Sequence, residues 1–263
     1  MIFETIKLST DARGVAQLVL ARSVKHNAMS EQMLDDLLAA AHHIANDPAI
    51  RVVVLSAEGK SFCAGGDLAW MRAQMDMDPK TRSAQAGKLA YMLQALDTLP
   101  QPLIGRIHAN AFGGGVGLAS VCDIAIGVEG ALMGLTETRL GLIPATIGPY
   151  VVARMGSANA RRVFMSGRRF DAHEAQTLGL LAKVLAPDAL DDAIEAEVTP
   201  YLSCAPGAVA DAKALVRALS TPIDAQTIEH TIEALAQRWE SPESLEGISA
   251  FFEKRAPTWA EQE

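Results

Sequence analysis

Hydrophobic residues follow two alternating patterns in the first half of the chain. Short runs dense in Val and Leu predict β-strands at residues 15–20, 51–56, 103–108 and 123–127. After the first run, apolar residues from Met33 to Ile44 recur at helical spacing, behind Ser30 as a suitable N-cap and ahead of Pro48. This strand–helix–strand order predicts an α/β layer.

The second half of the chain has a weaker strand pattern and a stronger helical one. Asp171 and Glu174 predict a capping box at the start of a short helix, and residues 180–185 predict one last strand. Two long helical stretches follow at residues 188–219, interrupted by a proline, and 223–254.

The length and composition of the chain are typical of a folded protein with a sizeable core. The chain has 263 residues, of which 49% are hydrophobic and 21% charged. We expect an α/β core over residues 1–190 and a helical region over residues 191–263. The net charge is −8 and the basic residues are not clustered. Nucleic acid is therefore not an expected partner, because neutralising phosphates requires clustered Lys and Arg.

The cysteines and the N-terminal residues indicate a reducing compartment. Cys63, Cys122 and Cys204 are odd in number and widely spaced, so they fit neither a disulfide framework nor a zinc site. Residues 1–11 lack the apolar stretch of a secretory signal, and no apolar run reaches the ~20 residues that span a bilayer. We expect a cytoplasmic location, with no membrane partner and no metal.

Three short segments carry candidate chemistry: residues 60–68, 112–118 and 136–144. In the first two, glycines come directly before a predicted helix, where unpaired N–H groups can hold an anion or a developing oxyanion. The third places the carboxylate of Glu137 among apolar neighbours. A glycine cluster alone is more often a tight turn or close packing than a binding loop, and Glu137 alone could be a surface charge or a partner of Arg139. Neither a dinucleotide-binding fingerprint nor a P-loop is present.

In order along the chain, these segments resemble the crotonase superfamily, which contains enoyl-CoA hydratases and isomerases. The resemblance rests on residues 61–68, on Gly113-Gly114-Gly115 leading into Cys122-Asp123-Ile124-Ala125, and on residues 137–144, and it covers essentially the whole chain. It implies a spiral of repeated ββα units with a C-terminal helical region that takes part in trimer packing. The assembly implied is a homotrimer or a dimer of trimers.

The resemblance also implies the roles of particular residues. The thioester carbonyl of an acyl-CoA substrate would lie in an oxyanion hole made by the N–H groups of Gly66 and Gly114, and Glu137 would move protons. The coenzyme A moiety belongs to the substrate, and no separate cofactor is implied. The residues that would contact it are Val24, Lys25, His26, Ala64, Asp67, Leu68 and Lys254.

The chain departs from the typical hydratase of this superfamily at Gly117, where a second catalytic glutamate is usual. With Glu137 alone, two reactions stay open: hydration of a 2-enoyl-CoA, or isomerisation of a 3-enoyl-CoA. We favour hydration, because the sequence around Gly117 and residues 140–152 resembles bacterial proteins associated with methylglutaconyl-CoA hydration in leucine breakdown. A non-catalytic acyl-CoA-binding protein, a thioesterase and a decarboxylase are the further alternatives.

Several other side chains are candidates for the acyl pocket. Gly117 would enlarge it for a branched or carboxylated acyl group, Asn110 would line it, and Arg72 would contact a substrate carboxylate. Methionines at positions 71, 75 and 77 would give it an adaptable wall or simply pack in the core. His108 is expected to make a structural hydrogen bond, and Cys63 lacks a neighbouring base and is not expected to be a nucleophile.

Overall fold

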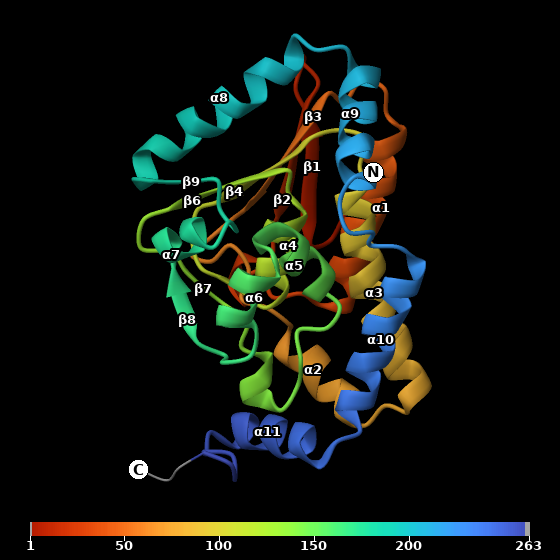
Figure 1. Ribbon diagram of the computed structural model, residues 1–263, viewed down its shortest axis with the longest axis vertical. Coiled ribbons are helices and arrows are strands. Elements are labelled where there is room, and N and C mark those ends of the chain that lie inside the picture. Colours follow the sequence, from red (N-terminus) through yellow and green to blue (C-terminus); the bar gives the residue numbers. More distant parts are fainter. Residues whose placement is uncertain (1, 261–263) are drawn as a thin grey trace.

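The computed structural model describes residues 2–260, and its centre is a six-stranded sheet (Figure 1). The strand order is β1-β2-β3-β4-β6-β9. These strands span Ile6–Thr10, Val15–Leu20, Val52–Ala57, Leu103–Ile107, Ile124–Val128 and Lys183–Leu185. β1 pairs with β2 in antiparallel fashion, and every later pairing is parallel. The four strands expected in the first half are confirmed, while β1 carries no clear pattern in the sequence.

A smaller sheet has the strand order β5-β7-β8. These strands span Ala111–Phe112, Leu132–Gly134 and Arg169–Asp171. β4 belongs to the large sheet and its successor β5 to the small one, and β6 and β7 divide in the same way. A helix follows each of these strand pairs. The expected ββα repetition is therefore present, with the two strands of each unit in different sheets.

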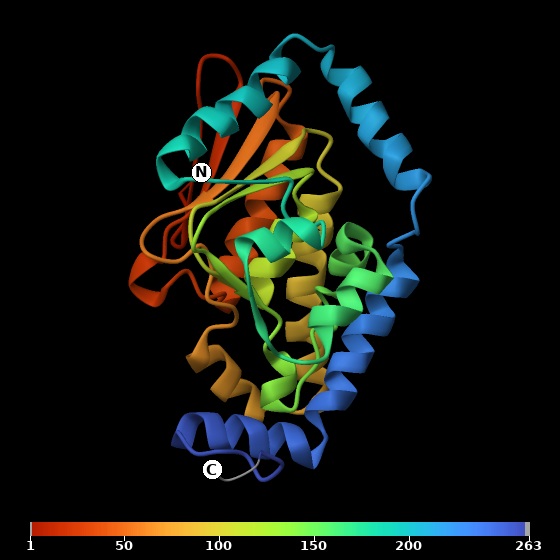
Figure 2. The same cartoon turned by 60° about the vertical axis from the view of Figure 1, so that its left-hand side comes forward.

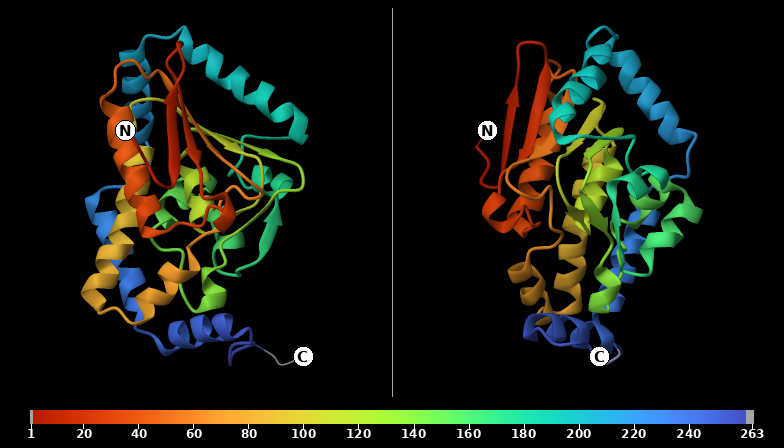
Figure 3. Two further views of the ribbon diagram at one scale, coloured as in Figure 1. Left: turned by 180° about the vertical axis from the view of Figure 1, so that it is seen from behind. Right: turned by 90° about the vertical axis from the view of Figure 1, so that its left-hand side faces the viewer.

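Eleven α-helices occur within residues 2–260. They are α1 Glu31–Asn46, α2 Leu68–Met75, α3 Pro79–Asp97, α4 Gly114–Val121, α5 Gly148–Met155, α6 Ser157–Phe164, α7 Ala172–Thr177, α8 Leu190–Leu202, α9 Pro206–Ala218, α10 Ala225–Trp239 and α11 Pro242–Glu253. α1, α3 and α10 lie side by side on one side of the large sheet, and α8 crosses its other face (Figures 1 and 2). α11 lies at the end of the molecule away from α8 and α9, beneath α2 (Figures 1 and 3).

Polar N-caps start several of these helices where the sequence predicts them. The Ser30 hydroxyl accepts a hydrogen bond from the Met33 N–H at 3.3 Å, and Asp171 accepts one from the Glu174 N–H at 2.8 Å. The Glu174 carboxylate does not complete a capping box, because it binds the guanidinium of Arg168 at 2.6 and 2.8 Å. An ion pair has replaced the expected return hydrogen bond.

The C-terminal region contains one more helix than expected. The stretch predicted at residues 223–254 is divided into α10 and α11, because Ser241 caps a new helix and Pro242 occupies its first turn. The chain turns here, and α11 packs against the 3-10 helix Glu137–Leu140 (η2). No helix within residues 2–260 is both long and apolar enough to cross a membrane.

Candidate active site

The first glycine segment forms a loop between β3 and α2. Gly65 has φ +97°, a conformation that other residues rarely adopt. Asp67 ends the loop by accepting hydrogen bonds from the N–H groups of Ala69 and Trp70, at 2.9 and 3.3 Å. Arg22 binds the second oxygen of the same carboxylate at 3.0 Å. The loop is therefore held from both sides, as a rigid binding loop requires.

The second glycine segment joins β5 to α4. Gly113 has φ +49°, and the buried helix α4 starts at Gly114. Within residues 2–260, the N–H groups of Gly66 and Gly114 have no hydrogen-bond acceptor. Met29 lies next to both glycines. It forms a β-bridge with Gly66, and its Sδ would lie 2.5 Å from a Cβ added at Gly114. The structure thus brings together two N–H groups that are free to bind a ligand.

Glu137 lies at the start of η2, beside these glycines. Its Oε1 would lie 3.0 Å from a Cβ at Gly113. Its Oε2 is buried and has no hydrogen-bond partner among the described residues. Burial away from water penalises the charged form and raises the pKa of Glu137 from 4.5 to about 7. A carboxyl with a pKa near neutrality can both accept and return a proton, which is the property of a general acid–base catalyst.

Gly66, Gly114 and Glu137 line one cavity of about 120 Å³. The rest of its wall is mainly apolar and comes from α2, α3, the segment after η2 and α10. The further residues of the wall are Met29, Trp70, Met71, Gln74, Ala86, Leu89, Leu142, Ile143, Pro144, Ala145, Thr146, Ile147, Leu235 and Trp239. Among these described residues, Glu137 is the one ionisable group. The cavity therefore combines a single proton carrier, two N–H donors and room for an apolar group.

The residues expected to contact coenzyme A are exposed on the first glycine loop or beside it, with two exceptions. Val24, Lys25 and His26 are exposed, and the His26 carbonyl accepts a hydrogen bond from the N–H of Ala64 at 3.1 Å. Leu68 is exposed on the first turn of α2. The 23–26 turn and the 64–68 loop therefore form one surface.

Asp67 and Lys254 are the exceptions. Asp67 is 7% exposed, and Arg22 and the start of α2 engage both oxygens of its carboxylate. It is thus a structural residue of the loop. Lys254 is exposed at the C-terminal end of α11, on a different part of the chain from the two loops.

Two residues expected to shape the acyl pocket are placed differently. The Asn110 side chain is not part of the cavity wall, because its Oδ1 accepts a hydrogen bond from the Leu132 N–H at 2.8 Å. Gly117 creates no open space, because the Cγ2 atom of Ile147 occupies the position beside it, 2.7 Å from where a Cβ would be. Both corrections follow from neighbours that are distant in sequence.

Of the remaining candidates, Met71 lines the cavity, whereas Arg72, His108 and Cys63 do not. The Arg72 guanidinium lies 5.6 Å from the ring centre of Phe252. His108 donates its Nε2–H to the carbonyl oxygen of Gly59 at 2.9 Å, which is a structural hydrogen bond. Cys63 is buried, and the loss of solvation raises the pKa of its thiol to about 12. Such a thiol is a poor nucleophile.

The sequence identifies Met71 of α2 as a wall candidate, but it does not identify Trp70 or the part of the wall that α10 contributes. Trp70 is positioned by its ring N–H, which donates to Gln85 Oε1 at 3.0 Å, while Leu235 and Trp239 come from a helix about 100 residues after Glu137. The buried face of α10 contains Ile228, Ile232, Ala236 and Trp239 at helical spacing. That spacing predicts a packed face, but nothing in it indicates that part of the face borders a cavity.

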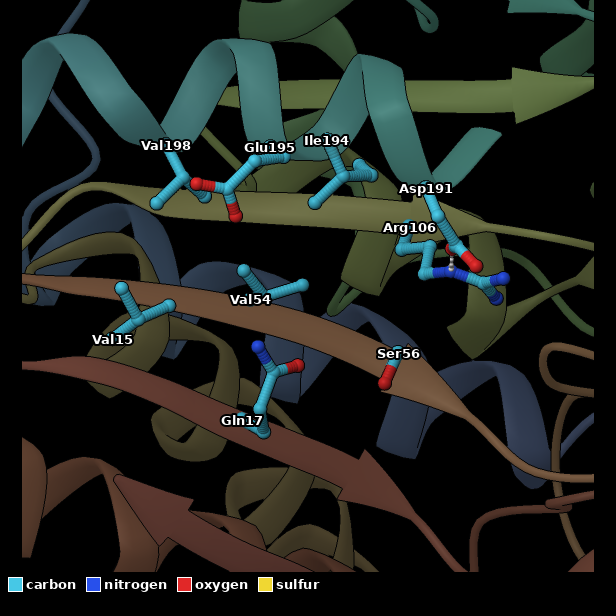
Figure 4. A pocket seen from close by; sticks show the side chains of 9 residues that line it. All are labelled: Val15, Gln17, Val54, Ser56, Arg106, Asp191, Ile194, Glu195 and Val198. Atoms are coloured by element: carbon cyan, nitrogen blue, oxygen red, sulfur yellow. Dashed lines mark hydrogen bonds and ion pairs between the residues drawn. The ribbon is translucent and has the colours of Figure 1, made fainter. Parts of the chain in front are cut away.

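A second cavity, of about 340 Å³, lies between α8 and the large sheet (Figure 4). Its charged groups are engaged. Arg106 Nε binds Asp191 at 2.6 Å, and Glu195 binds Arg13 at 2.5 Å. Figure 4 shows Gln17 and Ser56 on the sheet below these pairs. The residues expected to act on a substrate are all elsewhere, so this cavity is not the candidate active site.

A spiral of two sheets and surrounding helices, in which two glycine loops with free N–H groups lie beside one buried carboxylate, is a crotonase-like fold. Comparison with known sequences identifies the family. Residues 10–262 match the enoyl-CoA hydratase/isomerase family, so the chain belongs to it. A solved enoyl-CoA hydratase from Shewanella pealeana is 40% identical with a TM-score of 0.80, over 98% of this chain and 96% of that one. One from Mycobacterium smegmatis is 35% identical with a TM-score of 0.79, over 97% and 99%. The mitochondrial methylglutaconyl-CoA hydratase of Mus musculus is 32% identical over 96% of this chain and 81% of that protein.

Proposed function

We propose that the protein is an enoyl-CoA hydratase that adds water across the 2,3 double bond of a branched enoyl thioester. The observation that carries this proposal is the placement of Glu137 in one apolar cavity with the free N–H groups of Gly66 and Gly114. The family supplies the acyl-CoA class of substrate. The 23–26 turn and the 64–68 loop would receive the coenzyme A moiety outside the cavity.

In the proposed reaction, the thioester oxygen accepts hydrogen bonds from Gly66 and Gly114. The Glu137 carboxylate takes a proton from water as the water oxygen forms a bond to C3. The electron pair of the double bond moves to the thioester, giving an enolate whose oxygen is held by the two N–H groups. Protonated Glu137 then delivers its proton to C2, so that one water is added and the carboxylate is regenerated. A pKa near 7 suits both halves of this exchange.

The shape and chemistry of the wall support a branched acyl group. Trp70, Leu89, Leu142 and Trp239 offer a short apolar enclosure, which would favour a compact branched chain over a long straight one. The similarity to methylglutaconyl-CoA hydratase adds a carboxylated branched substrate to the compounds worth testing. Its carboxylate would have to contact Gln74 or Thr146, the polar side chains of the wall besides Glu137.

Isomerisation is the second candidate, and one observation favours it. Glu137 is the single ionisable side chain among the described residues of the wall, and moving a proton from C2 to C4 of a 3-enoyl thioester needs one carboxylate. The same N–H groups would hold the dienolate that forms between the two transfers. Hydration needs in addition a site for the water, which the amide of Gln74 or the hydroxyl of Thr146 would supply.

The proposal also includes a cytoplasmic trimer or dimer of trimers. Support for self-association comes from α9, which has no buried residue and exposes Leu215, Val216 and Leu219. In Figure 2 this helix stands away from the two sheets. Apolar side chains on such a helix are typical of a surface that another subunit covers. Light scattering of the purified protein would give the number of subunits.

One absorbance assay separates the two reactions. The enzyme is incubated with conjugated 2-enoyl-CoA and unconjugated 3-enoyl-CoA thioesters, each straight, branched and carboxylated, and the conjugated chromophore is followed. We expect it to disappear with a branched 2-enoyl-CoA. Appearance of the chromophore from the 3-enoyl set, without loss from the 2-enoyl set, would establish isomerisation instead. No change with either set, together with measurable acyl-CoA binding, would indicate a non-catalytic protein.

A further inference from the structure

The wall of the candidate active site contains one contact that joins two distant segments. Gly117 lies in the middle of α4, and Ile147 is the residue immediately before α5. A Cβ at Gly117 would lie 2.7 Å from Ile147 Cγ2 and 3.1 Å from Ile147 Cβ. Real Cβ atoms do not approach other carbons this closely, so the Ile147 side chain occupies the volume that any other residue at position 117 would need.

Ile147 is at the same time a wall of the cavity that contains Glu137. It is 2% exposed, and the next atom beside Gly117 is Leu93 Cδ1 at 3.6 Å from the Cβ position. The Ile147 side chain therefore packs against α4 at Gly117 and also borders the cavity. Because isoleucine is branched at Cβ, its χ1 angle is stiff, and it cannot fold away from a new atom at position 117 without moving as a unit.

We infer that Gly117 and Ile147 together set the size of the acyl group that this cavity accepts. Gly117 provides the recess into which Ile147 is withdrawn, and Ile147 forms the wall that limits the acyl group on that side. The inference rests on the proposed function only in taking the cavity as the acyl-binding site, and it holds for hydration and isomerisation alike.

Two substitutions should move the wall in opposite directions. Ile147→Ala removes three carbon atoms and opens the recess, so larger acyl groups should gain affinity relative to small ones. Gly117→Ala should push Ile147 towards the cavity, so larger acyl groups should lose affinity relative to small ones. A single methylene in an apolar pocket changes discrimination by about 10–200-fold, so each variant should shift the ratio of affinities for a large and a small acyl group by about tenfold or more.

The measurement is calorimetric binding of saturated acyl-CoA thioesters, which do not react: acetyl-, 3-methylbutyryl- and octanoyl-CoA. Gly117→Ala, Ile147→Ala and the double variant form a cycle. In the double variant the added Cβ has no Ile147 atom to meet, so the effect of Gly117→Ala should largely disappear. Gly207→Ala, at an exposed glycine with nothing within 4 Å, and Ile194→Ala, on α8, are the matched controls. Thermal melts of all variants confirm folding.

Opposite shifts of the size preference in the two single variants, cancelled in the double variant, would support the inference. An unchanged preference in folded Ile147→Ala, or equal and additive losses for every acyl group, would overturn it. The proposed function is tested separately, by the hydration assay on the unchanged protein. A protein that fails to hydrate but shows the shifted preference overturns the reaction and leaves the role of Gly117 and Ile147 intact.

Discussion

Replacing Glu137 by Gln should abolish most of the activity and at the same time stabilise the fold above neutral pH. Burial raises the pKa of this carboxyl from 4.5 to about 7, and its Oε2 has no hydrogen-bond partner among the described residues. Glu137→Gln keeps the size of the side chain and removes its charge. Loss of a general acid–base typically lowers the rate by ~10²–10⁴-fold.

The expected stabilisation follows from the raised pKa. Between pH 4.5 and about 7, the folded protein keeps a proton on Glu137 that the unfolded chain has lost, so wild-type stability falls as the pH rises through this window. Each pKa unit corresponds to about 1.4 kcal/mol, so ionised Glu137 costs the fold about 3 kcal/mol above pH 8. The variant carries no such cost. Its advantage should be near zero at pH 4.5 and about 3 kcal/mol at pH 8.

Urea denaturation of wild type and Glu137→Gln at pH 4.5, 6, 7 and 8 measures this difference directly. Glu129→Gln is the matched control, because Glu129 is an exposed carboxylate a few residues earlier in the chain. Its stability difference should be small, because substitutions of exposed side chains usually change stability little. Hydration or isomerisation by each variant is measured on the same preparations.

A stability difference between wild type and Glu137→Gln that is independent of pH would contradict the raised pKa of Glu137. That result would mean that Glu137 ionises at its ordinary pKa and is not the buried acid–base. Turnover within a few-fold of wild type would refute its catalytic role even if the pH dependence appeared. The two measurements therefore test the electrostatic environment and the chemistry independently.

Two further substitutions test the loops that carry the glycines. Gly114→Pro places a residue suited to the first position of α4 but deletes its N–H, so kcat should fall by ~10²–10³-fold. Because the proline ring would meet Met29, the substitution is made in a Met29→Ala background, and Met29→Ala alone is the control. Retained kcat in a folded variant would exclude the oxyanion role. Asp67→Ala removes the cap of α2 and the partner of Arg22 and should cost about 1–2 kcal/mol in urea denaturation at pH 7. Burial opposes ionisation of Asp67, yet Arg22 and the helix N–H groups outweigh burial and lower the pKa of Asp67. The stability lost in Asp67→Ala should therefore shrink as the pH falls below 3.8. A loss of stability that persists below that pH, or no loss at pH 7, would contradict the cap assignment.

The sequence predicts the parts of the site that depend on local chain geometry. Two glycine-rich turns ahead of helices are local signals, and the structure places Gly66 and Gly114 on one cavity with unused N–H groups. Ser30 and Asp171 are local signals too, and each accepts the N-cap hydrogen bond expected of it. A cap or a glycine turn is decided by atoms within a few residues, so its pattern is readable without the fold.

Features that depend on tertiary neighbours are where sequence reasoning fails. Glu174 has the spacing of a capping box, but Arg168 binds its carboxylate. Asn110 is close in sequence to the glycines, but the N–H of Leu132 uses its side chain. In both cases a partner that the local pattern does not include competes for the same polar group. Burial of Glu137, and hence its pKa, similarly requires Leu142 and the helices around it to be in place.

At Gly117 the sequence correctly predicts that a second carboxylate is missing, but the enlarged pocket expected there is wrong. The sequence shows that no carboxylate is present there, and this fact limits the site to Glu137 as its acid–base among the wall residues. A missing side chain also suggests an empty volume, yet close packing of protein interiors means that a neighbour fills such a volume. Ile147 does so from 30 residues away. The absence of a side chain at position 117 therefore acts on the substrate through the position of Ile147, and any attempt to introduce a second carboxylate at 117 must first remove that side chain.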